Sequence, residues 1–141
     1  MTREELLSIP RKARDIADEQ DRIEELKSKL YSPRGLDTNE KVQSSGSQTA
    51  LADVVMDMEQ KLEARKEELR KLRADALKAI NEADLDSNER LVLMLRYTEG
   101  CAWSEITETI HYSVASVFRI HRAALDELFE GAEDGRRTDR R

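Results

Sequence analysis

The most informative stretch of the chain is WSEITETIHYSVASVFRIHRAAL, which runs from Trp103 to Leu125. Its apolar residues recur three and four positions apart, which is the spacing of one buried face of an α-helix. The polar run from His111 to Ser113 interrupts this pattern, and serine is a preferred residue at a helix N-cap. The stretch therefore predicts two short helices joined by a turn of about three residues.

A further short helix is expected just before this pair. Asp86 can cap its start, Glu89 stands three positions later as in a capping box, and Gly100 is a natural helix stop. Together the helices predict a helix-turn-helix module, in which the first helix of the pair braces the second and the second enters the major groove of DNA. The expected core of this module consists of Leu95, Trp103, Ile106, Ile110, Val117, Ile120 and Leu125.

The second helix of the pair is expected to contact double-stranded DNA. Residues 113–125 contain no acid, although the chain has a formal net charge of −6. Arg119 and Arg122 lie three positions apart on one helical face and suit guanine edges or phosphates, whereas Phe118 suits a thymine methyl group. The predicted DNA-binding residues are Ser113, Ala115, Ser116, Phe118, Arg119, His121 and Arg122.

Other interpretations of these residues stay open. The module could be a three-helix bundle used only for packing, with its arginines on a solvated face, and His121 could either bond a phosphate or pack beside Trp103. His111, His121 and Cys101 are ten residues apart in sequence, so they lack metal-ligand spacing. The chain has no phosphate-binding glycine loop and no nucleophile elbow, so we expect neither an enzyme nor a cofactor.

Two long helices are expected before the module. Pro10 suits the first turn of a helix, which predicts a start near Ser8. A heptad seam then follows the four-three alternation, formed by Ile9, Ala13, Ile16, Gln20, Ile23, Lys27 and Leu30. The second helix, from about Thr49 to Ala83, has its own seam, formed by Leu51, Val55, Met58, Leu62, Arg65, Leu69, Leu72, Ala76, Ala79 and Ala83.

These patterns predict an all-α chain. A long N-terminal coiled-coil helical hairpin spans residues 1–83, with a loop at about 32–48, and the three-helix helix-turn-helix module spans 84–130. A flexible tail follows at 131–141. The seams are compatible with an antiparallel hairpin within one chain and also with a homodimer through the coiled coil.

Composition limits the remaining classes. Of 141 residues, 38% are charged and only 4% aromatic, which favours long solvated helices over one large core. The acidic net charge excludes a protein that simply coats nucleic acid. The single cysteine, Cys101, excludes an intrachain disulfide. The charged N-terminus is unlike a signal peptide and no apolar run has membrane-spanning length, so we expect a soluble cytoplasmic protein with no membrane partner.

The last third of the chain resembles region 4 of bacterial sigma factors. It is more closely similar to the phage-encoded, sigma-70 region 4-like transcriptional regulators of the RinA and ArpU type, which pair a coiled-coil half with such a module. The residues that carry this resemblance include Leu85, Glu89, Arg90, Val92, Leu93, Leu95, Arg96, Tyr97, Gly100, Trp103, Ser104, Glu105, Ile106, Tyr112, Ser113, Val117, Arg119, Ile120, His121, Ala124 and Leu125.

The sequence departs from the family pattern at several positions. Ala102 replaces the usual Ser or Thr cap, Thr107 replaces an alanine and its hydroxyl needs a partner, and His111 replaces a glycine in the turn. A left-handed conformation at His111 would cost about 1 kcal/mol. Ala115 and Ser116 stand where a basic residue is usual, which favours a dimer or a polymerase-assisted complex on DNA.

The resemblance implies a transcription regulator of phage or prophage genes, acting in the cytoplasm of a bacterial host and in contact with RNA polymerase. Two alternatives come from other classes. One is a small terminase-like subunit of DNA packaging, because such proteins also join helix-turn-helix and coiled-coil parts. The other is an adaptor that binds RNA polymerase and has no independent DNA binding.

Overall fold

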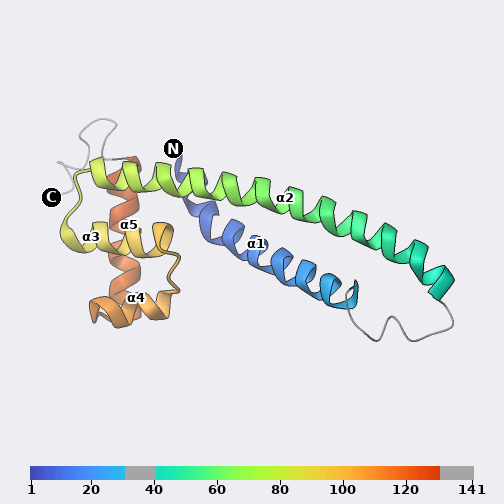
Figure 1. Cartoon of the computed structure of the whole chain (residues 1–141). Coiled ribbons are helices and arrows are strands. Elements are labelled where there is room, and N and C mark those ends of the chain that lie inside the picture. Colours follow the sequence, from blue (N-terminus) through green and yellow to red (C-terminus); the bar gives the residue numbers. More distant parts are fainter. Residues whose placement is uncertain (31–40, 131–141) are drawn as a thin grey trace. The chain divides into compact units, whose positions relative to one another are not determined.

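A computed structural model describes residues 1–30 and 41–130, with side chains described for 1–30 and 49–130. These residues form helices joined by turns, with no strand among them, which confirms the predicted all-helical class. No helix in the described ranges is long and apolar enough to cross a membrane. The elements, shown in Figure 1, are α1 (Arg3–Leu30), α2 (Lys41–Glu82), α3 (Ser87–Leu93), the π-helical turn η2 (Met94–Thr98), α4 (Trp103–Ile110) and α5 (Val114–Phe129).

The chain divides into two compact units. One consists of Ala13–Glu68, and the other joins Met1–Lys12 to the chain from Leu69 onward. The first twelve residues therefore belong to the same compact unit as α3, α4 and α5. The domain boundaries expected from the sequence, near residues 83 and 130, remain a prediction.

In the unit 13–68, α1 packs antiparallel to α2. Ile23 is fully buried in a cluster with Val55 and Leu62. The Lys27 ammonium lies 2.8 Å from a Glu59 carboxylate oxygen, and the Lys66 ammonium donates to the Gln20 side-chain oxygen at 3.1 Å. A step of seven residues toward the N-terminus of α1 thus corresponds to a step of seven residues toward the C-terminus of α2, as expected for an antiparallel pair. The two polar seam residues, Gln20 and Lys27, are accommodated because α2 places a polar partner opposite each.

The buried face of α2 follows the predicted seam at Val55, Leu62, Leu69 and Ala76, with exceptions at two other positions. Arg65, expected on the seam, is exposed, whereas Ile80, outside the predicted seam, is fully buried. The prediction continued a strict repeat of 3.5 residues per turn. A straight α-helix turns once per 3.6 residues, so its buried stripe drifts relative to that repeat. The drift accumulates along this long helix and brings Ile80 rather than Ala79 to the centre of the buried face.

The start of α1 also differs from the prediction. The helix begins at Arg3, where Thr2 and Glu5 form the reciprocal capping box that their spacing predicts: the Glu5 N–H donates to Thr2 Oγ1 at 3.1 Å, and the Thr2 N–H donates to Glu5 Oε1 at 2.8 Å. The expected start near Ser8 is therefore wrong, and the helix runs through Pro10. Proline removes one helical hydrogen bond, and the complete or near-complete burial of Leu6 and Ile9 beside it offsets that loss.

The second helix begins earlier than predicted, at Lys41 instead of near Thr49. Extending an existing helix adds one hydrogen bond for each residue fixed, so a polar segment that includes Gly46 can continue it at a cost of about 1 kcal/mol for the glycine. Helix therefore covers 41–48 of the loop expected at 32–48. Residues 31–40 and the predicted tail at 131–141 lie outside the described residues.

Two arginines tie distant segments of the second unit together. The Arg90 guanidinium donates to the backbone oxygens at the end of α2 and in the following turn, with bonds of 2.7–3.3 Å to Ile80, Asn81, Ala83 and Leu85. These carbonyls have no partner within the helix, so Arg90 acts as a side-chain cap. Arg3 at the start of α1 lies 3.1 Å from Glu130 and 3.6 Å from Asp126, at the end of α5.

The packing of Ile23 can be tested by substitution. We expect Ile23→Ala to lower the free energy of unfolding by about 2–5 kcal/mol, because it removes a fully buried side chain from between α1 and α2. Urea unfolding followed by circular dichroism measures this. The control, Val54→Ala, changes a half-exposed residue of α2 and should stay within about 0.5 kcal/mol of the wild type. Equal effects of the two substitutions would contradict the packing described.

Candidate nucleic-acid interface

One small apolar core joins the three C-terminal helices. Val92 of α3, Ile106 of α4 and Val117 of α5 are fully buried against one another. Of the residues predicted for this core, Ile106, Val117 and Leu125 are buried. The remaining four are half-buried and pack around the three central side chains: Leu95, Trp103, Ile110 and Ile120. Figure 1 shows α5 running across both α3 and α4, so this core sets the orientation of α5.

The first of these helices starts where the sequence predicts, and the helical segment continues through η2 to Thr98, shortly before Gly100. Asp86 Oδ1 accepts from the Glu89 N–H at 2.8 Å and Glu89 Oε1 accepts from the Asp86 N–H at 3.2 Å, which completes the capping box. After α3 the chain widens into the π-helical turn η2, which carries Arg96 and Tyr97. Gly100 then takes a positive φ of 78°, a conformation that glycine adopts without strain.

In α4 and at its N-cap, Thr107 and Ala102 each find a local hydrogen-bond partner. Ala102 has no side-chain acceptor, but its own N–H donates to Glu105 Oε1 at 2.7 Å, so half of a capping box is present. The Thr107 hydroxyl, which needs a partner, donates to the Ser104 carbonyl oxygen one turn earlier, at 2.7 Å. Neither residue leaves a polar group that disturbs the packing of α4.

The turn between α4 and α5 spans His111 to Ser113. His111 has φ 62° and ψ 39°, so this position is left-handed, and its N–H donates to the Thr107 carbonyl oxygen at 2.8 Å. Ser113 caps α5 as predicted, because its hydroxyl oxygen accepts from the Ser116 N–H at 3.1 Å. The turn therefore closes α4 and opens α5 within three residues.

The outer face of α5 carries most of the residues predicted to contact DNA. Ser113, Ala115, Phe118, Arg119 and Arg122 are exposed, and Ser116 is half-buried. The Arg119 guanidinium donates to the Ser116 hydroxyl at 3.0 Å, and Ser113 donates to the same hydroxyl at 3.1 Å. Ser116 therefore holds the Arg119 side chain in position. Because a guanidinium has five N–H groups in a planar fork, Arg119 retains donors for an incoming acceptor.

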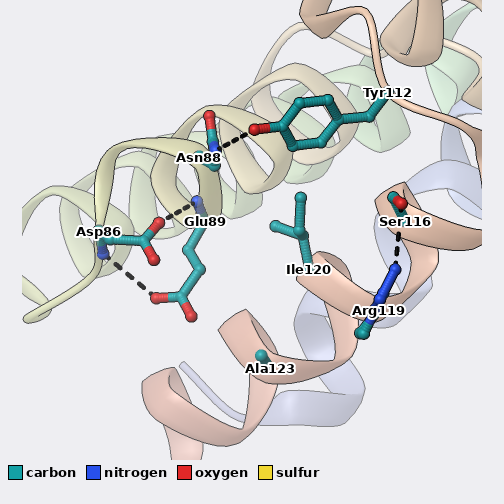
Figure 2. Close-up of a pocket in the computed structure, with 8 residues that line it drawn as sticks. All are labelled: Asp86, Asn88, Glu89, Tyr112, Ser116, Arg119, Ile120 and Ala123. Carbon is teal, nitrogen blue, oxygen red and sulfur yellow. Dashed lines mark hydrogen bonds between the residues drawn. The ribbon is translucent and has the colours of Figure 1, made fainter.

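Beside this face lies an open pocket of about 380 Å³ between the start of α3 and α5 (Figure 2). Asn88 donates to the Tyr112 hydroxyl at 3.1 Å across one side of it, and the Asp86–Glu89 capping box forms another side. Arg119 lines the same pocket. Asp86 and Glu89 at this pocket use their carboxylate oxygens to cap α3. On the α5 side of the pocket, the Arg119 guanidinium supplies hydrogen-bond donors.

His121 faces away from this outer surface. Its Nε2 lies 2.7 Å from the Tyr97 hydroxyl oxygen, and its ring meets the Trp103 ring edge to face at 4.8 Å between centroids. Trp103 also meets Phe118 edge to face at 4.9 Å, and the Arg96 guanidinium lies over the Trp103 ring at 4.5 Å. Of the two roles expected for His121, the geometry matches packing beside Trp103.

The electrostatic setting of His121 agrees with that placement. Burial, together with the positive charges of Arg96, Arg3 and Arg122, lowers the pKa of His121 to about 4. Burial also raises the pKa of Tyr97 to about 12, so its hydroxyl keeps its proton at neutral pH. Tyr97 therefore shares this hydrogen bond with a neutral ring, and the tautomer of His121 sets which of the two groups donates. A neutral His121 supplies no positive charge to a phosphate.

Sequence reasoning missed three residues at this surface. Val114 is half-exposed on the first turn of α5, and Tyr112 and Asn88 form the hydrogen bond across the pocket. Val114 resembles a core residue by type, and no pattern in the sequence indicates that it faces outward. Among the described residues no group of three or more His, Cys, Asp or Glu side chains could hold a metal ion.

No protein-family model matches this chain, and neither a curated protein nor a solved structure is significantly similar to it.

The strain at His111 yields a stability prediction. We expect His111→Gly to raise the free energy of unfolding by about 1 kcal/mol, because glycine adopts the left-handed conformation without the Cβ penalty. His111→Ala keeps the Cβ and serves as the control, with no comparable gain. Chemical denaturation of the three proteins measures the difference. A loss of stability in the glycine variant would mean that the His111 side chain contributes more than its backbone strain costs.

The buried imidazole yields a pH prediction. The folded state lowers the pKa of His121 from 6.5 to about 4, so its stabilising contribution is complete above pH 6.5 and is lost as the pH falls toward 4. His121→Gln can still accept from Tyr97 but does not titrate. The melting temperature of the wild type relative to this variant should therefore fall between about pH 7 and about pH 4.5. A constant difference would show that His121 is not held neutral.

Proposed function

We propose that this protein is a DNA-binding transcription regulator in which α4 and α5 act as a helix-turn-helix and α5 is the recognition helix. The observation that carries the proposal is the outer face of α5. It exposes Arg119 and Arg122 on a segment, 113–125, that contains no acid within a chain of net charge −6. A helix that enters the major groove needs such a local face, because DNA presents phosphates along its whole length.

The surrounding geometry supports this use of α5. The turn of three residues brings α4 against α5, and the core of Val92, Ile106 and Val117 holds the pair together. Ser113 caps α5, and the Arg119 guanidinium is oriented by Ser116. In a helix-turn-helix the N-terminal turns of the second helix meet the base edges, and these turns are where Ala115, Ser116 and Arg119 lie.

The antiparallel packing of α1 on α2 complements this interpretation. In the proposed arrangement these helices form a coiled-coil hairpin that presents the module, and a second copy of the chain would double the number of recognition helices. The sequence resemblance implies regulation of phage genes. In that case α5 would bind a promoter while the protein contacts RNA polymerase.

The arginine pair provides the direct test. Each good bidentate contact between an arginine and a base is worth about 1–3 kcal/mol, so Arg119→Ala combined with Arg122→Ala should weaken specific binding by at least about tenfold. The measurement is fluorescence anisotropy at fixed, stated salt, using a duplex that the wild-type protein selects from a randomised library. The slope of log affinity against log salt should fall by about one for each phosphate contact removed.

A matched control removes the same charge elsewhere. Arg11 and Arg14 are also exposed and three positions apart on a helix, so replacing both by alanine should leave the affinity nearly unchanged. Equal affinity of the Arg119/Arg122 variant and the wild type would remove the proposed reading face. A wild type that selects no duplex but retains RNA polymerase would favour the adaptor, and a ring in native mass spectrometry would favour the packaging subunit.

A further inference from the structure

The outer face of α5 has an apolar side next to its basic side. Val114 is 50% exposed and Phe118 is 40% exposed. Residues four apart on a helix lie on the same side, one above the other, so these two form a continuous apolar strip over the first two turns. The same spacing places Arg122 after Phe118 and Arg119 after Ala115. The apolar strip (Val114 and Phe118) thus runs beside the arginines of the proposed reading face.

The ring of Phe118 is fixed in this position rather than free to turn inward. It rests edge to face on Trp103, with 4.9 Å between ring centroids. Trp103 in turn is held between His121, at 4.8 Å, and the Arg96 guanidinium, at 4.5 Å. This chain of contacts runs from the interior to the surface. Contact groups whose own positions are locked by packing bind with less loss of side-chain entropy.

The surroundings of the apolar strip limit which chemical groups can bind over it. It lies on the helix segment without acids, beside two guanidinium groups, so an occupant must combine negative charge with a small apolar group. In the major groove, the C5-methyl group of thymine is the apolar group that base edges present, and it lies close to phosphates and to guanine acceptors. The apolar strip and the two neighbouring guanidinium groups are complementary to a thymine methyl group that lies close to phosphates and guanine acceptors.

We propose that Val114 and Phe118 form a specificity element that reads the C5-methyl group of thymine in the bound DNA. This inference rests on the proposed function, since it requires α5 to enter the major groove. Arg119 and Arg122 would then supply affinity for guanine edges and phosphates, while the apolar strip distinguishes thymine from cytosine at the neighbouring positions.

The experiment removes the methyl group and nothing else. The probe is the duplex that the wild-type protein selects from a randomised library, with each deoxythymidine replaced in turn by deoxyuridine. Binding is measured by fluorescence anisotropy for the wild type, Val114→Ala and Phe118→Ala. Val54→Ala is the matched control, because Val54 is also 50% exposed but lies on α2. Far-ultraviolet circular dichroism and thermal unfolding show whether each variant keeps the fold.

We expect at least one thymine at which deoxyuridine weakens wild-type binding by about fourfold, the effect of burying one methyl-sized group. At that position the weakening should vanish in Val114→Ala or in Phe118→Ala and persist in Val54→Ala. Val114 makes the test robust, because this side chain lies outside the Trp103 stack and its loss should not disturb the fold.

Three results would overturn the inference, and they are distinguishable. If the wild type binds its selected duplex specifically but no thymine is sensitive to deoxyuridine, the apolar strip does not read methyl groups, although the proposed function stands. The same holds if the Phe118 or Val114 variants lose self-association or polymerase binding while their sensitivity to deoxyuridine is unchanged. If the wild type selects no duplex at all, the proposed function fails and this inference fails with it.

Discussion

The mutual burial of Val92, Ile106 and Val117 fixes how α5 is presented to its surroundings. Each side chain comes from a different helix, so none of α3, α4 and α5 can rotate without exposing an apolar residue. Because Val117 faces inward, the residues on the opposite side of α5, including Arg119 and Arg122, must face outward. The proposed DNA-reading surface is therefore a direct consequence of this core.

A second layer of contacts connects that core to the surface. The hydrogen bond between Tyr97 and the neutral ring of His121 supports Trp103, and Trp103 supports the half-exposed ring of Phe118. A charged His121 would be unfavourable here because the ring is largely buried and because Arg96, Arg3 and Arg122 add positive charge. His121 thus helps to hold Trp103 in position, and through Trp103 also Phe118.

The acidic residues of the chain are unevenly distributed along the sequence. The net charge of −6 would oppose DNA if it were spread evenly, but α5 has no acid before Asp126. Asp126 and Glu130 at the end of α5 lie within 3.6 Å of Arg3, which partly offsets their charge. The segment that begins the chain thereby influences the electrostatics of the segment that we propose binds DNA.

Short-range signals in the sequence account for much of the local structure. Capping residues and helical periodicity gave the bounds of α4 and the starts of α3 and α5, because these signals act over three or four residues. Features that depend on distant segments could not be read in this way. They include the continuous helix through Pro10, the exposure of Arg65, the burial of Ile80, the inward position of His121 and the outward position of Val114. Only tertiary structure decided them, since the environment of a side chain depends on which other helix packs against it, and periodicity within one helix carries no information about that partner.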